Sequence, residues 1–254
     1  MTSPIKLEPD VGLSLTIGEG VATVQLTARR MSLRMLRALE ALPQQLMDSD
    51  IRAVVVESER DDFCHGIDLT DPEILGSVQT DRGRSIASLG GQMIERWSTL
   101  GVPTVAAVSN WTIGAGACLA FACDFRYAAP LTRISFPEVD RGMHLSWGII
   151  PLLIRECGLP LTRRLAMLGD PLAAEEFPVD VFTLSDDPRT AAHGLATRLA
   201  DKPAAAVRHI KAVISADGPS AETLDEDVRR FVDSLSSPGF AQAMNEWFAG
   251  KRSN

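Results

Sequence analysis

The alternation of apolar and polar positions changes its period along the chain. Near the N-terminus, residues 11–17 and 22–26 alternate strictly, and Gly18-Glu19-Gly20 separates the two runs. A period of two on both sides of a glycine-containing turn is typical of a β-hairpin. Between residues 31 and 47 the apolar positions recur at helical spacing despite Pro43, and this pattern predicts a helix.

Strand-like and helix-like patterns then alternate as far as about residue 145. Strands are predicted at 51–56, 105–108, 124–128 and 133–136, and helices at 86–100 and 114–122. Beyond this point helical patterns dominate, at 146–157, 160–168, 189–201, 203–216, 219–235 and 239–249. Residues 180–190 are the best candidate for a linker. We therefore expect a layered α/β core over residues 1–185 and a helical region over residues 186–254.

Composition and charge exclude several classes of protein. The chain has 254 residues and a net charge of −8, which disfavours nucleic acid and anionic membrane as partners. The N-terminus lacks an apolar signal core, and charged residues interrupt every apolar stretch, so no spanning helix is expected. The four cysteines have neither a C-x-x-C nor a zinc-site spacing. We expect a cytoplasmic protein without a metal site.

A glycine-rich turn, Gly114-Ala115-Gly116, joins a strand-like to a helix-like segment. A dinucleotide-binding fingerprint would need a small residue where Leu119 stands. The first amides of a helix have no internal partners and carry partial positive charge. Two such amides from two loops can stabilise an enolate oxygen. The segment at 61–69 is a candidate for the second loop, since Gly66 gives it freedom and Asp68 could cap a following helix.

Three motifs, in this order, resemble the crotonase (enoyl-CoA hydratase/isomerase) superfamily. They are Phe63-Cys64-His65-Gly66-Ile67-Asp68, then Val102 to Val108 with the glycine-rich turn and Cys123-Asp124, then Phe136-Pro137-Glu138 with Gly142. The resemblance covers roughly residues 11–215. It implies an α/β fold, a spiral of repeated ββα units with a C-terminal helical trimerisation region. A homotrimer or a dimer of trimers is expected.

The resemblance also implies a ligand and a set of site residues. The ligand is an acyl thioester of coenzyme A or of an acyl-carrier protein, with no further cofactor. The amides of Ile67 and Ala115 are the implied oxyanion donors, and Glu138 is the implied general base and acid. Substrate contacts are expected at His65, Gly66, Asp68, Gly114, Cys118, His144, Ser146 and Arg29.

One position departs from the hydratases that the chain resembles. Those enzymes use two glutamates, and the first of the two positions holds Cys118 here. A thiol is a weak acceptor and cannot replace a carboxylate that positions water. A single carboxylate can still remove a proton at one carbon and return it at another, so we expect isomerase-like chemistry.

Two alternatives stay open at this point. The run at 148–158 and the histidines His65 and His144 favour a dehydratase or related tailoring enzyme. Such an enzyme would act on a carrier-protein-bound acyl group in polyketide-type secondary metabolism. The missing second carboxylate favours a non-catalytic thioester-binding subunit.

Overall fold

The computed structural model describes residue 5, residues 7–47 and 49–215, and then residues 225, 228, 229, 231–233, 235, 236 and 238–251. Most of the helix expected at 219–235 lies outside these described residues. Within them, no helix is long and apolar enough to cross a membrane.

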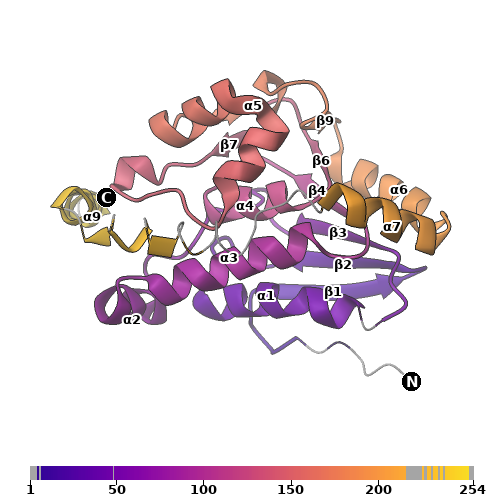
Figure 1. The fold of residues 1–254 in the computed structure, drawn as a ribbon, viewed down its shortest axis with the longest axis horizontal. Coiled ribbons are helices and arrows are strands. Elements are labelled where there is room, and N and C mark those ends of the chain that lie inside the picture. The colour runs from indigo at the N-terminus through magenta and orange to yellow at the C-terminus, as the bar shows by residue number, and fades with distance from the viewer. Residues whose placement is uncertain are drawn as a thin grey trace.

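A six-stranded sheet forms the centre of the molecule, in the order β1-β2-β3-β4-β6-β9 (Figure 1). The predicted hairpin is confirmed: β1 (Leu13–Gly18) pairs with β2 (Val21–Leu26) in the antiparallel sense. The other neighbours pair in parallel. Their strands are β3 (Ala53–Ser58), β4 (Thr104–Val108), β6 (Phe125–Ala128) and β9 (Thr183–Leu184).

Both faces of this sheet are buried, which explains the continuous apolar runs in β3 and β4. Successive side chains point to opposite faces. One face joins the large core formed with α1 (Leu33–Met47), α3 (Arg84–Ser98) and α4 (Ala115–Ala122). The other face packs against α6 (Pro188–Ala200), where Ala192, Ala196 and Ala200 permit a close approach. The sheet is thus a rigid support for the loops that follow its strands.

A second, three-stranded sheet lies beside the first. It consists of β5 (Trp111–Ile113), β7 (Arg133–Ser135) and β8 (Leu172–Ala173). The sequence pattern predicts β7 but not β5; both strands have three residues, too few for a clear period of two. β5 nevertheless matters for the site, since it leads directly into the glycine-rich turn.

Two expectations about loops are wrong. The helix α2 (Pro72–Asp81) begins after Asp71, whose carboxylate accepts a hydrogen bond from Glu73 N; Asp68 does not cap it. The segment 180–190 is not a linker, because it adds β9 to the sheet and buries Val181 and Phe182. Tertiary pairing, rather than local composition, decides both segments.

The C-terminal half is helical, as expected. It contains α5 (Ile149–Leu168), α7 (Ala204–Ser215) and α9 (Pro238–Lys251), with short 3₁₀ turns η1 (Val139–Arg141) and η2 (Ala174–Glu176). A kink at Gly158, with φ 76° and ψ 160°, divides α5 into the two helices that the sequence pattern predicts.

Candidate active site

Two loops lie edge to edge because their backbones are hydrogen-bonded. Cys64 N donates to Trp111 O over 3.2 Å, and Ile113 N donates to Cys64 O over 2.8 Å. On the other side of the first loop, Met31 N donates to Gly66 O over 2.9 Å. The segment 61–69 is therefore fixed between the strand β5 and the segment that precedes α1.

Two glycines permit this close approach. Gly66 has φ +80° and Gly114 has φ +51°, a region that side chains other than glycine rarely adopt. A Cβ on Gly66 would lie 3.0 Å from Ile113 O. The missing side chain at Gly66 leaves room for the second loop, and both glycines supply the backbone conformation of the turns.

The residues after these glycines present two backbone N–H groups. Ala115 is the first residue of α4, so its N–H has no acceptor within the helix. Among the described residues, neither Ile67 N nor Ala115 N donates a backbone hydrogen bond. Two unpaired N–H groups on adjacent loops can bind an oxygen on which negative charge develops.

Gly116 is required for a different reason from Gly114. A Cβ at this position would lie 2.6 Å from Cys64 Cβ and 2.8 Å from Cys64 O. The second glycine of the turn thus lets the first turn of α4 pack against the first loop.

Glu138 follows β7 and places its carboxylate beside the same turn. A Cβ on Gly114 would lie 2.7 Å from Glu138 Oε1. Burial raises the pKa of Glu138 to about 7, although its own backbone N–H and the charge of Arg141 act in the opposite direction. Its Oε2 is buried and has no hydrogen-bond partner among the described residues. A carboxylate that titrates near neutral pH is suited to proton transfer.

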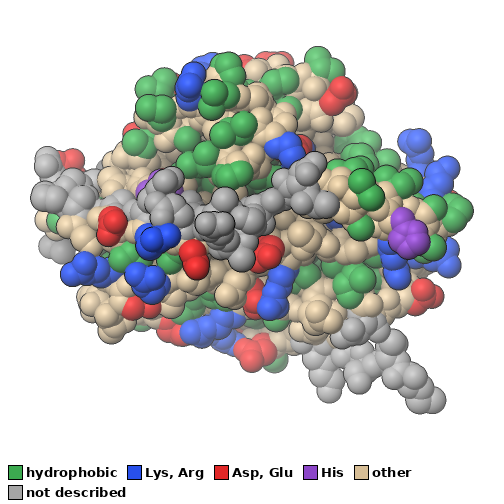
Figure 2. Space-filling view, viewed as in Figure 1, with side chains coloured by type: hydrophobic (Ala, Val, Ile, Leu, Met, Phe, Trp, Pro, Cys, Tyr) green, Lys and Arg blue, Asp and Glu red, His purple; other side chains and the backbone are tan. Residues whose placement is uncertain are grey.

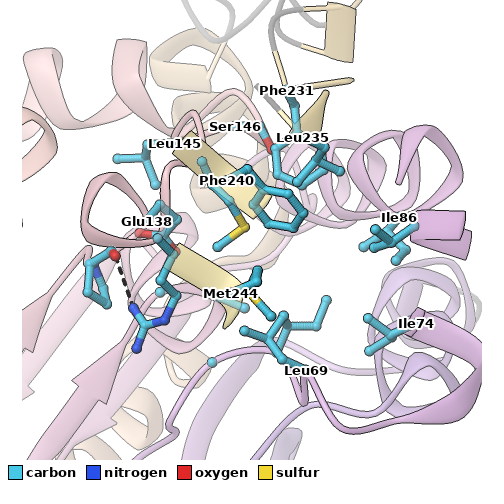
Figure 3. A pocket seen from close by; sticks show the side chains of 18 of the residues that line it. Leu69, Ile74, Ile86, Glu138, Leu145, Ser146, Phe231, Leu235, Phe240 and Met244 are labelled. Carbon is cyan, nitrogen blue, oxygen red and sulfur yellow. Dashed lines mark hydrogen bonds between the residues drawn. The ribbon is translucent and has the colours of Figure 1, made fainter. Parts of the chain in front are cut away.

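These groups open into a cavity of about 360 Å³. In Figure 3, Glu138 and Leu145 lie on one side of the cavity, while Ile74 of α2 and Ile86 of α3 lie on the other. Phe240 and Met244 of α9 also line it. These wall residues cannot be predicted from the sequence, because an apolar residue carries no local signal that it will line a cavity.

The structure brings together most of the residues expected at the site. The cavity lining contains His65, Gly66, Ile67, Gly114, Ala115, Cys118, Glu138, His144 and Ser146. In the part of the chain that is described, Asp68 and Arg29 do not belong to it. Asp68 Oδ1 instead accepts bonds from the N and Oγ1 of Thr70 over 3.0 and 2.7 Å.

Arg29 does not line the cavity itself, but it is bonded to His65, which does. Its Nη2 lies 2.9 Å from Asp62 Oδ2, and the same oxygen lies 2.9 Å from His65 Nε2. Burial lowers the pKa of His65, so the ring is neutral at pH 7. Arg29 Nε also donates to His65 Nε2 over 3.2 Å, so Asp62 and Arg29 together hold this ring nitrogen. His65 therefore adds a fixed, uncharged polar group to the cavity wall.

Cys118 lies on α4 one turn after Ala115 and is buried. It stands in the cavity lining where the hydratase pattern has a glutamate. Among the described lining residues, Glu138 is the only carboxylate. The described part of the site thus combines two N–H donors with a single carboxylate.

An α/β fold that places two loop amides and one buried carboxylate in an apolar cavity defines a class of proteins that can stabilise an enolate. Comparison with known proteins narrows this class. The chain matches the enoyl-CoA hydratase/isomerase family model over residues 16–251. The chain belongs to this family, and its fold is the crotonase fold.

Individual relatives are distant. A crystal structure from Streptomyces coelicolor A3(2), provisionally named an enoyl-CoA hydratase, is 31% identical, with a TM-score of 0.76 over 98% of this chain and 96% of that one. An enoyl-CoA hydratase/isomerase from Mycobacterium paratuberculosis has a TM-score of 0.80 at 20% identity, over 93% and 98% of the two chains, and shows the fold alone. The short-chain-enoyl-CoA hydratase of Clostridium acetobutylicum is 28% identical over 130 residues, a match that spans 49% of its length and 51% of this chain.

Proposed function

We propose that this protein is an enzyme that moves a proton, and with it a double bond, within the acyl group of a coenzyme A thioester. The observation that carries the proposal is the single carboxylate of Glu138, with a pKa of about 7, beside two unpaired N–H groups. Membership of the enoyl-CoA hydratase/isomerase family supports the thioester as substrate. The reaction consumes no oxidant or reductant, so we propose that it needs no bound cofactor.

The reaction would proceed through an enolate. The thioester oxygen accepts hydrogen bonds from Ile67 N–H and Ala115 N–H, while Glu138 removes a proton from C2 of a 3-enoyl thioester. The electron pair of the broken C–H bond delocalises onto that oxygen and C4. Glu138 then returns the proton to C4, which leaves a 2-enoyl thioester and an ionised carboxylate. One oxyanion donor contributes about 3 kcal/mol, and acid–base help contributes about 10²–10⁴-fold.

Cys118 distinguishes this reaction from hydration. Adding water to the double bond requires a positioned water as well as proton transfer to carbon. Cys118 is buried and its thiol is a weak acceptor. We therefore propose that water addition is slow in this enzyme compared with proton transfer.

The test is a panel of 2-enoyl and 3-enoyl thioesters incubated in deuterated water and read by mass spectrometry. The wild type should incorporate deuterium at C2 or C4, and Glu138→Gln should lower the rate at least about 10²-fold. Cys118→Glu is the matched gain-of-function variant and should raise hydration relative to isomerisation. Exchange that persists unchanged in Glu138→Gln would show that this carboxylate is not the base.

The same panel separates the alternatives. Faster turnover of a carrier-protein thioester than of the coenzyme A ester would favour the tailoring enzyme. Binding without any exchange would favour a non-catalytic subunit.

We further propose that the protein assembles as a homotrimer or a dimer of trimers. Figure 2 shows apolar side chains gathered over α5 and at the edge formed by α6 and α7. On α7, Ile210, Val213 and Ile214 are 61%, 75% and 64% exposed. Exposed apolar clusters of this kind are common at interfaces. Sedimentation velocity would measure the assembly, and a monomer at micromolar concentration would contradict it.

A further inference from the structure

The apolar cavity contains two polar groups that the protein itself leaves unpaired. Ser146 is 5% exposed and Trp147 is 7% exposed, and both line the cavity. Within the described residues, neither the Ser146 hydroxyl nor the Trp147 indole N–H has a hydrogen-bond partner. Neither atom is among the fully buried polar atoms without a partner, so both are open to the cavity, where water can reach them. A ligand that fills the cavity removes this water, and only a matching polar group on the ligand restores the lost hydrogen bonds.

The backbone holds both groups in place at some expense to stability. Trp147 has φ +67°, which is strained for a bulky residue and is characteristic of functional sites. Ile149 N donates to Ser146 O over 3.4 Å and joins this strained turn to α5. The position of the indole is therefore set by the turn and not by chance packing.

A glycine on the neighbouring helix makes room for the indole. A Cβ on Gly90 of α3 would lie 1.9 Å from Trp147 Cε2 and 2.2 Å from Nε1. Glycine inside a helix is less favourable than alanine. A strained tryptophan and a helical glycine together keep the indole against the cavity wall.

The surroundings of the two groups are apolar. In Figure 3 the Ser146 side chain lies near Phe231 and Leu235, across the cavity from Ile74. A plain hydrocarbon chain bound here would remove water from the hydroxyl without replacing the lost hydrogen bonds. A site with a buried hydrogen-bonding group discriminates strongly against a ligand that lacks the matching group.

We propose that the acyl group of the substrate carries a hydrogen-bonding oxygen, a hydroxyl or an oxo group, which Ser146 and Trp147 recognise. Ser146 Oγ can donate or accept, and Trp147 Nε1 can only donate. An oxygen atom on the acyl chain can pair with either group. The inference rests on the proposed function in so far as the ligand is an acyl thioester.

Direct binding tests this inference without relying on turnover. Calorimetry would compare hexanoyl-CoA with its 4-, 5- and 6-hydroxy forms, all of which lack the double bond on which the enzyme acts. In the wild type we expect at least one hydroxylated ester to bind about tenfold or more tightly than hexanoyl-CoA. Ser146→Ala and Trp147→Phe should each reduce that ratio toward one, and the alanine variant should bind plain hexanoyl-CoA at least as well as the wild type does.

A matched control is available in the same fold. Thr162 is 3% exposed, and its Oγ1 donates to Gly158 O over 2.9 Å on α5, away from the cavity lining. Thr162→Val removes a buried hydroxyl that already has a partner and should leave the binding ratio unchanged.

The outcomes distinguish this inference from the proposed function. Equal affinity for all four esters, no binding of any of them, or an unchanged ratio in Ser146→Ala would overturn the polar subsite. A preference for a hydroxylated ester, combined with no deuterium exchange on any enoyl thioester, would contradict the proposed function while the subsite stands.

Discussion

At the scale of the single residue, the pKa of Glu138 depends more on burial than on neighbouring charges. Burial raises its pKa to about 7, and the opposing effect of Arg141 is smaller. The Arg141 guanidinium is held elsewhere, since its Nη1 donates to Pro137 O over 2.9 Å, the bond drawn in Figure 3. A residue that the sequence shows only as a glutamate after a proline thus has a carboxyl group that titrates near neutral pH.

This pKa predicts how activity depends on pH. The free enzyme must hold Glu138 ionised to remove a proton, so kcat/KM should fall about tenfold per pH unit below a pKa of about 7 and level off above it. A pH profile with a 3-enoyl thioester would measure this. A profile that stays flat down to pH 5 would mean that the carboxylate titrates as an exposed glutamate does.

The raised pKa of Glu138 also predicts how the stability of the folded protein depends on pH. The folded-state pKa of about 7 exceeds the ordinary value of 4.5. The unfolded state releases this proton above about pH 4.5 and the folded state only near 7, so the folded state loses stability as the pH rises from about 4.5 to about 7. At pH 8 this cost is about 3 kcal/mol.

Glu138→Gln should accordingly be more stable than the wild type at pH 8 and equally stable at pH 4. Thermal unfolding at the two pH values would measure the difference. Equal Tm differences between variant and wild type at both pH values would contradict it.

At the scale of the element, α3 contributes to the site through Gly90, which has no side chain and so leaves space beside the helix. Gly90 faces the Trp147 indole at a distance that no Cβ can occupy. The sequence analysis assigned α3 correctly from its apolar positions, but Gly90 gave no signal there. Only the approach of a residue 57 positions away along the chain explains this glycine.

Two glycine-to-alanine variants in helices should therefore have opposite effects. Gly90→Ala should destabilise the protein by about 1–3 kcal/mol and displace Trp147. Gly194→Ala in α6, where a Cβ would meet nothing within 4 Å, should stabilise it by about 0.5–1 kcal/mol. Denaturant unfolding would measure both, and a stabilised Gly90→Ala variant would show that the indole is not held there.

At the scale of the whole molecule, a partly buried ion pair attaches α7 to the main sheet. Lys211 Nζ lies 2.6 Å from Asp124 Oδ2 and 2.9 Å from Val102 O. Asp124 also accepts hydrogen bonds from the N and Oγ1 of Thr104 at the start of β4. Asp124 of the Cys123-Asp124 motif thus has a structural role, since it fixes a C-terminal helix.

Removing one member of this ion pair should lower the free energy of unfolding by more than removing an average surface charge does. Lys211→Met should lower stability by about 2 kcal/mol, because Asp124 keeps only its Thr104 partners. Lys202→Met, at an exposed position, is the matched control and should change stability by less than about 0.5 kcal/mol. Equal effects of the two variants on Tm would mean that the pair does not hold α7.

Sequence alone determined the order of most elements, and it pointed to the two loops and the carboxylate on which the proposed function rests. It could do so because period, turn residues and motif spacing are local properties of the chain. The strand β9, the helix cap at Asp71 and the wall formed by α9 could not be predicted, because each depends on which distant segment packs beside it. Sequence analysis likewise pointed to Cys118 and Ser146, but only the tertiary structure placed both in one cavity with Glu138. Their surroundings, and thus the pKa of the base and the unpaired hydroxyl, follow from that packing.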